Sequence, residues 1–322
     1  MKKNAQTKSK ESIGICYLVG AGPGDPGLLT LRGRECLSRA DVVIYDYLSN
    51  QELLGFAPEG AEKIYAGKIA GQHALHQEET NALLVNNTRA GKCVVRLKGG
   101  DPFLFGRGGE EAAALAAAGI RFEIVPGVTS AIGGLAYAGI PVTHRLRNSV
   151  LTIFTGHEGP GKESSSIDYK AIAVAPGTKV MLMGLKNLAT VTRELARAGM
   201  AAETPAALVR CASMANQQTL VGTLGTVAAL AEEAKFQAPA LAVFGEVVNL
   251  RESLNWFETR PLFGRRIAVT RSRRQAGGLI EALRELGADA YELPTIRIDA
   301  RLGHSVRSEW CWDSACTAQP SQ

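Results

Sequence analysis

Residues 93–118 read CVVRLKGGDPFLFGRGGEEAAALAAA, an apolar run followed directly by a glycine-rich turn and an alanine-rich stretch. The apolar residues indicate a buried strand, and a helix is expected to begin near Gly109. Between them, residues 96–111 hold five glycines, one proline and Asp101. Glycine permits positive φ angles and a close approach of the backbone to a bound molecule. A strand-to-helix turn needs some of these residues for its own sake. Their density nevertheless favours a ligand-binding loop, in which Asp101 can meet a hydroxyl or ammonium group.

Apolar β-branched runs alternate with helical patterns along most of the chain. This α/β alternation predicts a parallel or mostly parallel sheet with helices on both faces. A Gly-Ile-Pro sequence within 138–149 interrupts the pattern, so we expect two α/β halves, residues 13–142 and 143–255. The expected strands are 13–19, 42–45, 93–97, 122–125, 150–155, 178–183, 206–209, 218–221 and 241–244. The expected helices are 28–39, 78–89, 109–118, 129–137, 188–198 and 226–235.

A third section begins near Arg260 and shows one further strand, helix and strand at 266–270, 275–286 and 290–293. A single βαβ unit is too small to bury its own faces. We therefore expect residues 256–299 to form a linker and a partial, loosely packed C-terminal βαβ stub. The basic segment 1–12 is expected to be a flexible tail, and the polar segment 300–322 is expected to be disordered.

Charge and cysteine content limit the classes of function. The net charge is +5, but residues 11–259 carry 22 basic and 24 acidic side chains, which argues against general nucleic-acid binding. No apolar stretch reaches the roughly 18 residues of a membrane span. The six cysteines form no C-x-x-C motif, and His73 and His76 lie in a glycine-rich segment, so we expect no metal. These features indicate a protein of the reducing cytoplasm.

Residues 19–27, VGAGPGDPG, directly follow the first expected strand. They match the Gly-x-Gly-x-x-Gly fingerprint of dinucleotide binding, and Asp46 lies about 20 residues further on. Pro23 and Pro26, however, remove two backbone N–H groups from the loop that would hold a pyrophosphate. A loop that lies over a pocket is therefore favoured over a nicotinamide site.

Polar residues follow three other strands. Asp46 ends the strand 42–45, where open parallel sheets place their ligand crevice, and its carboxylate is a candidate general base. The alternative is a turn or helix cap. Lys68 follows another strand at the same edge, either as a functional group or as a solvated charge. Thr129 and Ser130 after the strand 122–125 either cap a helix or meet the same ligand.

The second half contributes apolar loop edges at 181–184 and 238–240, which suit an adenine ring, although methionines in such places often belong to the core. Arginine binds carboxylates in a bidentate manner. Arg107, Arg145 and Arg147 are therefore the candidates to bind a polyanionic substrate.

Six motifs together resemble the uroporphyrinogen-III C-methyltransferases of the tetrapyrrole methylase family. The resemblance covers residues 13–250 in order, and the long glycine-rich motif is its most specific part. The motifs are VGAGPGDPGLLTLRG (19–33), YDYL (45–48), GK (67–68), RLKGGDPFLFGRGGEE (96–111), VPGVTSA (125–131) and AYAGIPVTHR (136–145).

The resemblance implies a two-domain fold with S-adenosyl-L-methionine bound in a cleft between the domains, and a homodimer. It further implies two methyl transfers to uroporphyrinogen III, at C2 and C7, which give precorrin-1 and precorrin-2 for sirohaem and cobalamin synthesis. Asp46 would be the proton acceptor and Lys68 the proton donor. The implied cofactor contacts are Pro23, Gly99, Gly100, Asp101, Leu104, Thr129, Ser130, Met183, Ala212 and Ala240.

Residues 261–298 resemble the opening of uroporphyrinogen-III synthase, but that resemblance stops after about 40 residues, a length too short for a core of its own. We expect no synthase activity. The alternatives to uroporphyrinogen III methylation are a methyltransferase for a later corrin precursor, a nicotinamide-dependent oxidoreductase and a non-catalytic remnant.

Overall fold

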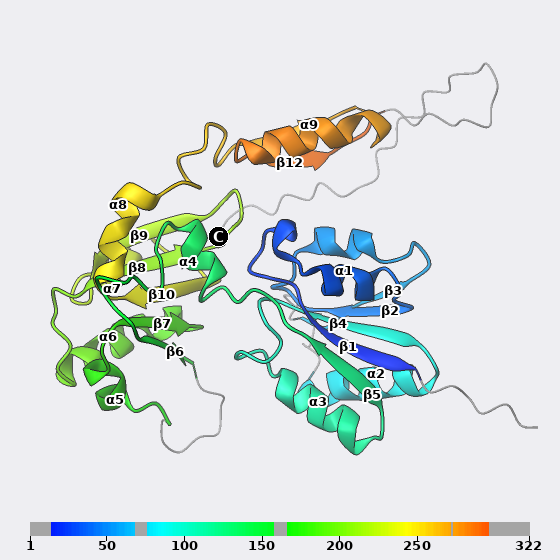
Figure 1. Ribbon diagram of the computed structural model, residues 1–322, viewed down its shortest axis with the longest axis horizontal. Helices are drawn as coiled ribbons and strands as arrows, with labels where there is room; N and C mark the ends of the chain where they lie inside the picture. The colour runs from blue at the N-terminus through cyan, green and yellow to red at the C-terminus, as the bar shows by residue number, and fades with distance from the viewer. Residues whose placement is uncertain (1–13, 68–75, 158–165, 272, 296–322) are drawn as a thin grey trace, which may run out of the picture. The chain divides into compact units, whose positions relative to one another are not determined.

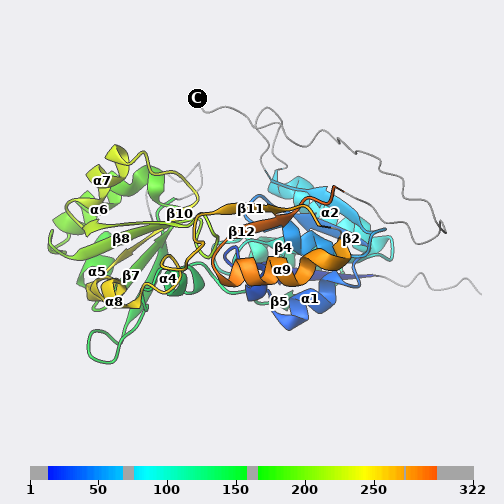
Figure 2. The ribbon, with the colours of Figure 1, turned by 90° about the horizontal axis from the view of Figure 1, so that it is seen from above.

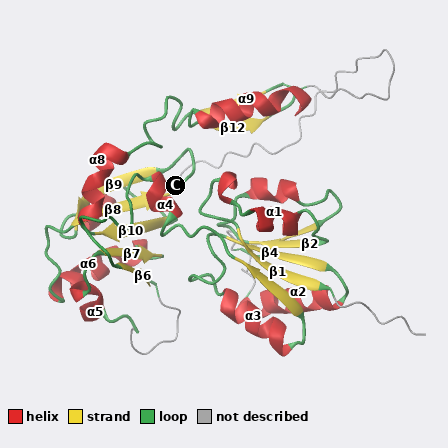
Figure 3. Ribbon diagram, in the orientation of Figure 1, coloured by secondary structure: helices red, strands yellow, loops and turns green. Residues whose placement is uncertain are grey.

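The computed structural model describes residues 14–67, 76–157, 166–271 and 273–295. The chain divides into two compact units, with the boundary between Asn255 and Trp256. In the described residues, the first unit contains two five-stranded sheets and the second contains a two-stranded sheet. Helices alternate with most of the strands, as the sequence predicts (Figure 3).

The first sheet is wholly parallel and has the strand order β3-β2-β4-β1-β5. Helix α1 packs on one face, while α2 and α3 pack on the other (Figure 1). Successive side chains of a strand point to opposite faces, and Val19 accordingly joins the α1 core while Leu18 joins the α2 and α3 core. The elements are β1 (Ile15–Gly20), α1 (Leu31–Leu37), β2 (Val42–Tyr45), η2 (Gln51–Phe56), β3 (Glu62–Tyr65), α2 (Gln77–Arg89), β4 (Cys93–Lys98), α3 (Gly108–Ala117) and β5 (Arg121–Val125).

The second sheet is mixed and has the order β6-β7-β10-β8-β9. Its β6 and β7 are parallel, but β10 is antiparallel to β7 and β8, and β8 is antiparallel to β9. The expectation of a mostly parallel sheet is therefore wrong for this half. For β8 and β9 the physical reason is that residues 211–217 are too short a connection for the crossover that a parallel pair requires. The elements are β6 (Leu151–Thr155), α5 (Tyr169–Val174), β7 (Thr178–Leu182), α6 (Leu188–Arg197), β8 (Pro205–Arg210), β9 (Gln218–Thr223), α7 (Val227–Glu233) and β10 (Ala240–Phe244).

Helix α4 (Gly133–Tyr137) carries the chain from the first sheet to the second. Leu135 and Ile140 are buried in one cluster with Val243 of the second sheet. Gly134 permits this packing, because a Cβ atom there would lie 2.8 Å from the Cβ of Ala212. The loop after β5 is thus fixed directly to the second half of the unit.

The second unit contains β11 (Arg266–Val269), α9 (Arg273–Glu285) and β12 (Asp289–Glu292), and the two strands are parallel. The helix lies along the two strands in both views (Figures 1 and 2). Its small core contains Val269, Ile280 and Ala290. The predicted βαβ unit is confirmed.

The expected strands agree with the observed ones to within two residues at each end. Helices α1 and α4 begin three and four residues later than expected. Residues Pro26–Leu28 form a separate 3-10 turn, η1, and the Thr30 hydroxyl accepts the amide of Gly33, which starts α1 at Leu31. Helix α5 was not expected. In the part of the chain that the structure describes, no helix has the length and apolarity needed to cross a bilayer.

Candidate functional site

The centre of the first sheet is a topological switch point. Strands β1 and β4 are neighbours, yet the chain leaves β1 toward α1 on one face and leaves β4 toward α3 on the other. Open α/β sheets bind ligands at such a point, outside the carboxyl ends of the strands. The loops after β1 and β4 are the ones that carry the two glycine-rich motifs.

These two loops are joined backbone to backbone. The amide of Gly22 donates to the carbonyl of Gly100 at 3.2 Å, and the amide of Gly100 donates to the carbonyl of Gly22 at 2.8 Å. Both residues have positive φ, 78° and 68°, which glycine adopts without steric cost. The glycines therefore serve contacts between loops as well as any contact with a ligand.

The loop after β5 completes the same arrangement. A Cβ atom on Gly127 would lie 2.3 Å from the carbonyl oxygen of Gly100 and 2.6 Å from the Cα of Gly20. No side chain fits at that distance. A Cβ atom on Gly100 would lie 3.8 Å from the Cα of Thr129, so the loops after β1, β4 and β5 converge.

Asp101 holds this arrangement together. Its Oδ1 accepts the amide of Phe103 at 2.8 Å, and its Oδ2 accepts the amide of Gly127 at 3.0 Å. The sequence suggested that this carboxylate would meet a ligand. In the structure both of its oxygens bind backbone amides, so its observed role is to fix the loops after β4 and β5.

Loops of the second half reach the same place through Asp25. Its amide donates to the Ser213 hydroxyl at 2.9 Å, and its Oδ2 accepts the Tyr137 hydroxyl at 2.6 Å. Gln217 bonds to both the amide of Ser213 and the carbonyl of Tyr137. Asp25 thereby links the loop after β1 to α4 and to the loop between β8 and β9.

The same contacts argue against a dinucleotide fingerprint in residues 22–27. The amide of Gly22 is bonded to Gly100, that of Asp25 to Ser213, and that of Gly27 to the Asp25 side chain. Pro23 and Pro26 have no amide hydrogen. Too few donors remain in this loop to cradle a pyrophosphate.

Met183, Ala212 and Ala240 lie at one edge of the second sheet. Ala240 pairs with Arg210 and Ala242 pairs with Met181, so the antiparallel register brings the end of β7, the end of β8 and the start of β10 together. Ala212 is buried, whereas Met183 is 49% exposed. A half-exposed methionine at a loop edge is an apolar surface available to a ligand.

Strained backbone is concentrated in these loops. Non-glycine residues with positive φ cost conformational energy and cluster at functional sites. Of the six in the described residues, five lie in the loops after β4, β7 and β8. They are Phe105, Arg107, Met183, Cys211 and Ser213, and the sixth is Lys235.

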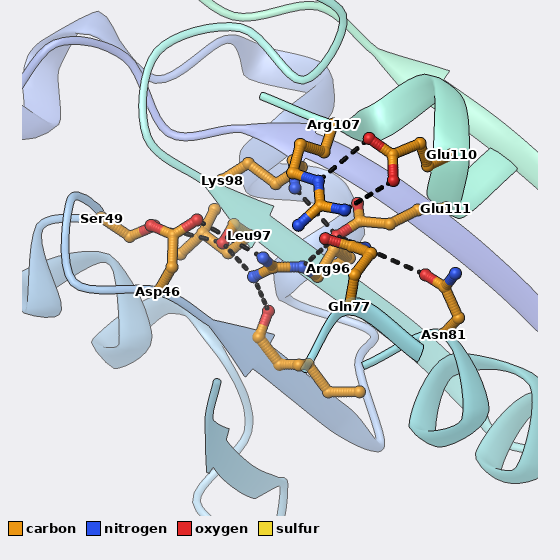
Figure 4. Close-up of polar contacts among 11 residues, drawn as sticks. Asp46, Ser49, Gln77, Asn81, Arg96, Leu97, Lys98, Arg107, Glu110 and Glu111 are labelled. Carbon is orange, nitrogen blue, oxygen red and sulfur yellow. Dashed lines mark hydrogen bonds and ion pairs between the residues drawn. The ribbon is translucent and has the colours of Figure 1, made fainter. Parts of the chain in front are cut away.

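Asp46 lies at the end of β2 beside a buried group of charges (Figure 4). Its Oδ1 accepts hydrogen bonds from the amide of Leu48 at 3.2 Å and from the hydroxyl of Ser49 at 3.1 Å. These bonds form a turn, which was the alternative prediction for Asp46. Its Oδ2 lies 3.5 Å from Nη2 of Arg96, and the side chain is 26% exposed. The carboxylate is thus both oriented and open to solvent.

The buried charges come from β4 and α3. Glu111 is fully buried, and its Oε1 lies 3.0 Å from Nε of Arg96 and 2.9 Å from Nζ of Lys98. Burial, with a smaller contribution from Arg96, lowers the pKa of Lys98 below its usual value, while Glu111 acts in the opposite direction. Neither Arg96 nor Glu111 was predicted from the sequence as a site residue. A signal was present, since charged residues two apart in an apolar strand must share one buried face.

The other predicted residues are placed as follows. Arg107 immediately precedes α3, and its exposed guanidinium pairs with Glu110 at 2.9 and 2.7 Å. Gly99 packs against Leu48, and Leu104 is partly exposed. Lys68 lies outside the described residues. Among the described residues, no group of three metal-binding side chains occurs.

Arg145 and Arg147 are not brought to this edge. Nη1 of Arg147 lies 3.6 Å from Oε2 of Glu246. Glu246 follows the last residues of β10, whereas Ala240 is its first residue. Asn148 in the same segment bonds to Thr178 at the start of β7. The segment is therefore attached to the edge of the second sheet opposite Met183 and Ala240. The prediction that these two arginines bind substrate gains no support from their position.

Comparisons with known proteins agree with this arrangement. The family model for tetrapyrrole (corrin/porphyrin) methylases matches residues 16–228. The S-adenosyl-L-methionine-dependent uroporphyrinogen III methyltransferase of Methanosarcina barkeri is 52% identical over 243 residues, which cover 76% of this chain and 95% of that protein. Porphyrin biosynthesis protein HemD of Ruminiclostridium josui is 48% identical over 285 residues, or 88% of this chain. The chain spans 56% of that protein. Since the first unit ends at Asn255, this second match includes part of the second unit.

A crystal structure of the uroporphyrin-III C-methyl transferase of Thermus thermophilus, complexed with S-adenosyl homocysteine, is also similar. It is 41% identical, covers 74% of this chain and all of its own, and superposes with a TM-score of 0.63. The parallel first sheet, the mixed second sheet and the convergent glycine loops are thus accompanied by extensive sequence identity. The chain belongs to the tetrapyrrole methylase family.

Proposed function

We propose that this protein transfers methyl groups from S-adenosyl-L-methionine to C2 and C7 of uroporphyrinogen III. The products would be precorrin-1 and then precorrin-2, which serve sirohaem and cobalamin synthesis. The proposal is carried by one observation, the convergence of three glycine loops at the switch point of the first sheet, with Asp46 at the same edge. The names of the relatives above point to the same reaction.

The residues at this edge fit the proposed cofactor. The loop edges at Pro23, Gly99, Gly100, Thr129 and Ser130 offer backbone and hydroxyl groups, while Leu104, Met183, Ala212 and Ala240 offer apolar surface. Asp101 would act by holding Gly100 and Gly127 in register. Bound S-adenosyl-L-methionine supplies a methyl group on a sulfonium, which is a good leaving group, so positioning of donor and acceptor accounts for much of the rate enhancement.

Asp46 is the proposed proton acceptor. When a pyrrole carbon bonds to the methyl group, the carbon–sulfur bond breaks, S-adenosyl-L-homocysteine leaves and the ring system must lose one proton. Asp46 combines a fixed orientation with a side chain that is partly exposed, which suits a general base. Lys68 remains the predicted proton donor.

The loop after β4 is the proposed contact for the tetrapyrrole. Phe103 and Phe105 are 56% and 40% exposed beside Arg107. Aromatic rings suit the apolar face of a macrocycle, and arginine suits its carboxylates. Binding of substrate would require Arg107 to exchange Glu110 for a substrate carboxylate.

The test is methyl transfer itself. The purified full chain would be incubated anaerobically with labelled S-adenosyl-L-methionine and uroporphyrinogen III, and a product carrying two labelled methyl groups is expected. Absence of transfer to uroporphyrinogen III, with transfer to a later corrin precursor, would support the alternative methyltransferase. Absence of transfer to either would support the non-catalytic alternative.

The base assignment has its own variant. Replacement of Asp46 by Asn keeps the size of the side chain and removes the proton acceptor, so kcat should fall by a factor of about 100 or more. Affinity for S-adenosyl-L-homocysteine should change less than twofold by calorimetry, because the proposed cofactor loops do not use Asp46. Unchanged turnover would remove Asp46 from the mechanism.

We also propose that the protein is a cytoplasmic homodimer, as the family resemblance implies. Light scattering on the eluted protein would report its mass, and a monomeric mass would contradict the proposal.

A further inference from the structure

Glu111 is an unusual carboxylate in this protein. It lies in the first turn of α3 with none of its surface exposed, and its Oε1 receives both Arg96 and Lys98 (Figure 4). Its Oε2 is buried and has no hydrogen-bond partner among the described residues. Burying charged groups costs desolvation free energy, so a buried ion pair does not by itself imply a gain in stability.

Arg96 connects this buried carboxylate to the proposed active site. Its Nε faces Glu111, its Nη1 donates to the carbonyl groups of Leu97 and Ile44, and its Nη2 faces Asp46. Every nitrogen of the guanidinium therefore has a protein acceptor. Because the guanidinium is planar and rigid, fixing its Nε edge also fixes the position of the Nη2 group that Asp46 meets.

We propose that Glu111 is a positioning residue for methyl transfer, acting through Arg96 on the carboxylate of Asp46. The inference rests on the proposed function and adds a residue to it. Glu111 compensates the charge of Arg96 and Lys98 in the interior, and it aligns Arg96 so that the Asp46 carboxylate keeps one orientation.

The surroundings of Asp46 are consistent with this role. Arg96 and Lys98 approach it from β4, Tyr65 interacts with it electrostatically from β3, and Tyr45 and Tyr47 flank it in sequence. Among these described neighbours, Arg96 is the cation within ion-pair distance. A shift of Arg96 would therefore change the orientation and the electrostatic surroundings of the Asp46 carboxylate.

The test is a double-mutant cycle between Glu111 and Asp46. In the otherwise wild-type chain, Glu111→Gln should lower kcat by a factor of about 10 while the KM for S-adenosyl-L-methionine changes less than twofold. In the Asp46→Asn background, the same substitution should lower the residual turnover less than twofold, because the group on which it acts is gone. Turnover is measured with labelled methyl donor over long incubations.

Two further variants complete the design. Arg96→Lys keeps the charge but cannot span both carboxylates, and it should behave as Glu111→Gln does in both backgrounds. If Glu111→Gln fails to fold, as judged by circular dichroism, the test is the effect of Arg96→Lys on kcat in the wild-type and Asp46→Asn backgrounds. Glu35→Gln removes a partly exposed carboxylate on α1 that pairs with Arg32 and Arg39. It is the control for loss of an ion-paired carboxylate away from the site, and it should leave kcat unchanged.

The outcomes separate this inference from the proposed function. If Glu111→Gln lowers kcat equally in both backgrounds, or raises KM in place of lowering kcat, Glu111 has a merely structural role and the inference is wrong. If the wild-type chain transfers no methyl group to uroporphyrinogen III, the proposed function itself is wrong, whatever Glu111 does.

Discussion

The hydroxyl group of Tyr137 in α4 donates a 2.6 Å hydrogen bond to Oδ2 of Asp25, in the loop after β1. The two residues are 112 positions apart in the sequence. Since α4 packs on the second sheet, this bond ties the loop after β1 to a helix that is fixed to the second half of the first unit. The geometry of the proposed cofactor site depends on such links.

The Tyr137 hydroxyl should therefore affect cofactor affinity without contributing to the core. Tyr137→Phe removes a hydrogen bond to a charged acceptor, a loss of about 1.5–3 kcal/mol at most. We expect the Kd for S-adenosyl-L-homocysteine, measured by calorimetry, to rise about 3-fold to 10-fold. Tyr17→Phe removes a hydroxyl from the middle of β1 and serves as the control. An unchanged Kd in Tyr137→Phe would show that this link does not shape the site.

Asp101 provides a second test of how the loops are held. Asp101→Ala leaves the amides of Phe103 and Gly127 without their acceptor, at a cost of about 1–3 kcal/mol for each donor that stays buried. Both the thermal midpoint and the affinity for S-adenosyl-L-homocysteine should fall. Asp101→Asn retains one acceptor and should lie between the wild type and the alanine variant. A loss of affinity with no loss of stability would instead indicate that the carboxylate meets the ligand directly.

The close approach of the glycine loops predicts a sharp contrast between two glycines. Gly127→Ala places a Cβ atom 2.3 Å from the carbonyl oxygen of Gly100, and overpacking against backbone costs about 1–3 kcal/mol or more. Gly109 has open space where its Cβ would lie, and Gly109→Ala should leave the free energy of unfolding nearly unchanged or slightly higher. Denaturant titration measures both, and equal destabilisation would contradict the packing described.

Cys16 predicts the pH dependence of stability. Burial in β1 raises the pKa of its thiol from 9.0 to about 12. Between these values the unfolded chain releases a proton that the folded chain retains, so the free energy of unfolding falls as pH rises above 9. From pH 8 to pH 10 the loss through this group should be about 1 kcal/mol. Cys16→Ala should remove this part of the fall in the free energy of unfolding between pH 8 and pH 10. Parallel plots of the free energy of unfolding against pH for wild type and variant would contradict the prediction.

Lys98 should make the free energy of unfolding change with pH in the opposite direction. Its pKa is lowered from 10.5 by burial, so between its folded value and 10.5 the unfolded chain binds more protons than the folded one. The stability of the wild type relative to Lys98→Met should therefore increase as pH rises toward 10.5. Chemical denaturation of both proteins at several alkaline pH values checks this, and a constant difference would argue that Lys98 is not desolvated.

Local sequence patterns were enough to predict most of the helices and strands and to find the motifs. Period-two and period-3.6 patterns are local properties. They located the strands of both sheets except β3, and the two strands of the second unit, to within two residues. The glycine-rich turns after β1 and β4 could also be predicted, because a high density of glycine and proline is a property of the local sequence. The relatives confirm the family that these motifs resemble.

The tertiary structure alone decided which of these parts meet. Register and strand order are not local, and they made the second sheet mixed, placed Met183 beside Ala240 and placed Arg147 at the opposite edge. They also placed the Asp101 carboxylate against backbone amides of two loops, and joined Arg96 to both Glu111 and Asp46. The physical reason is that hydrogen bonds and ion pairs between distant residues depend on how sheets pack, which no window of sequence contains.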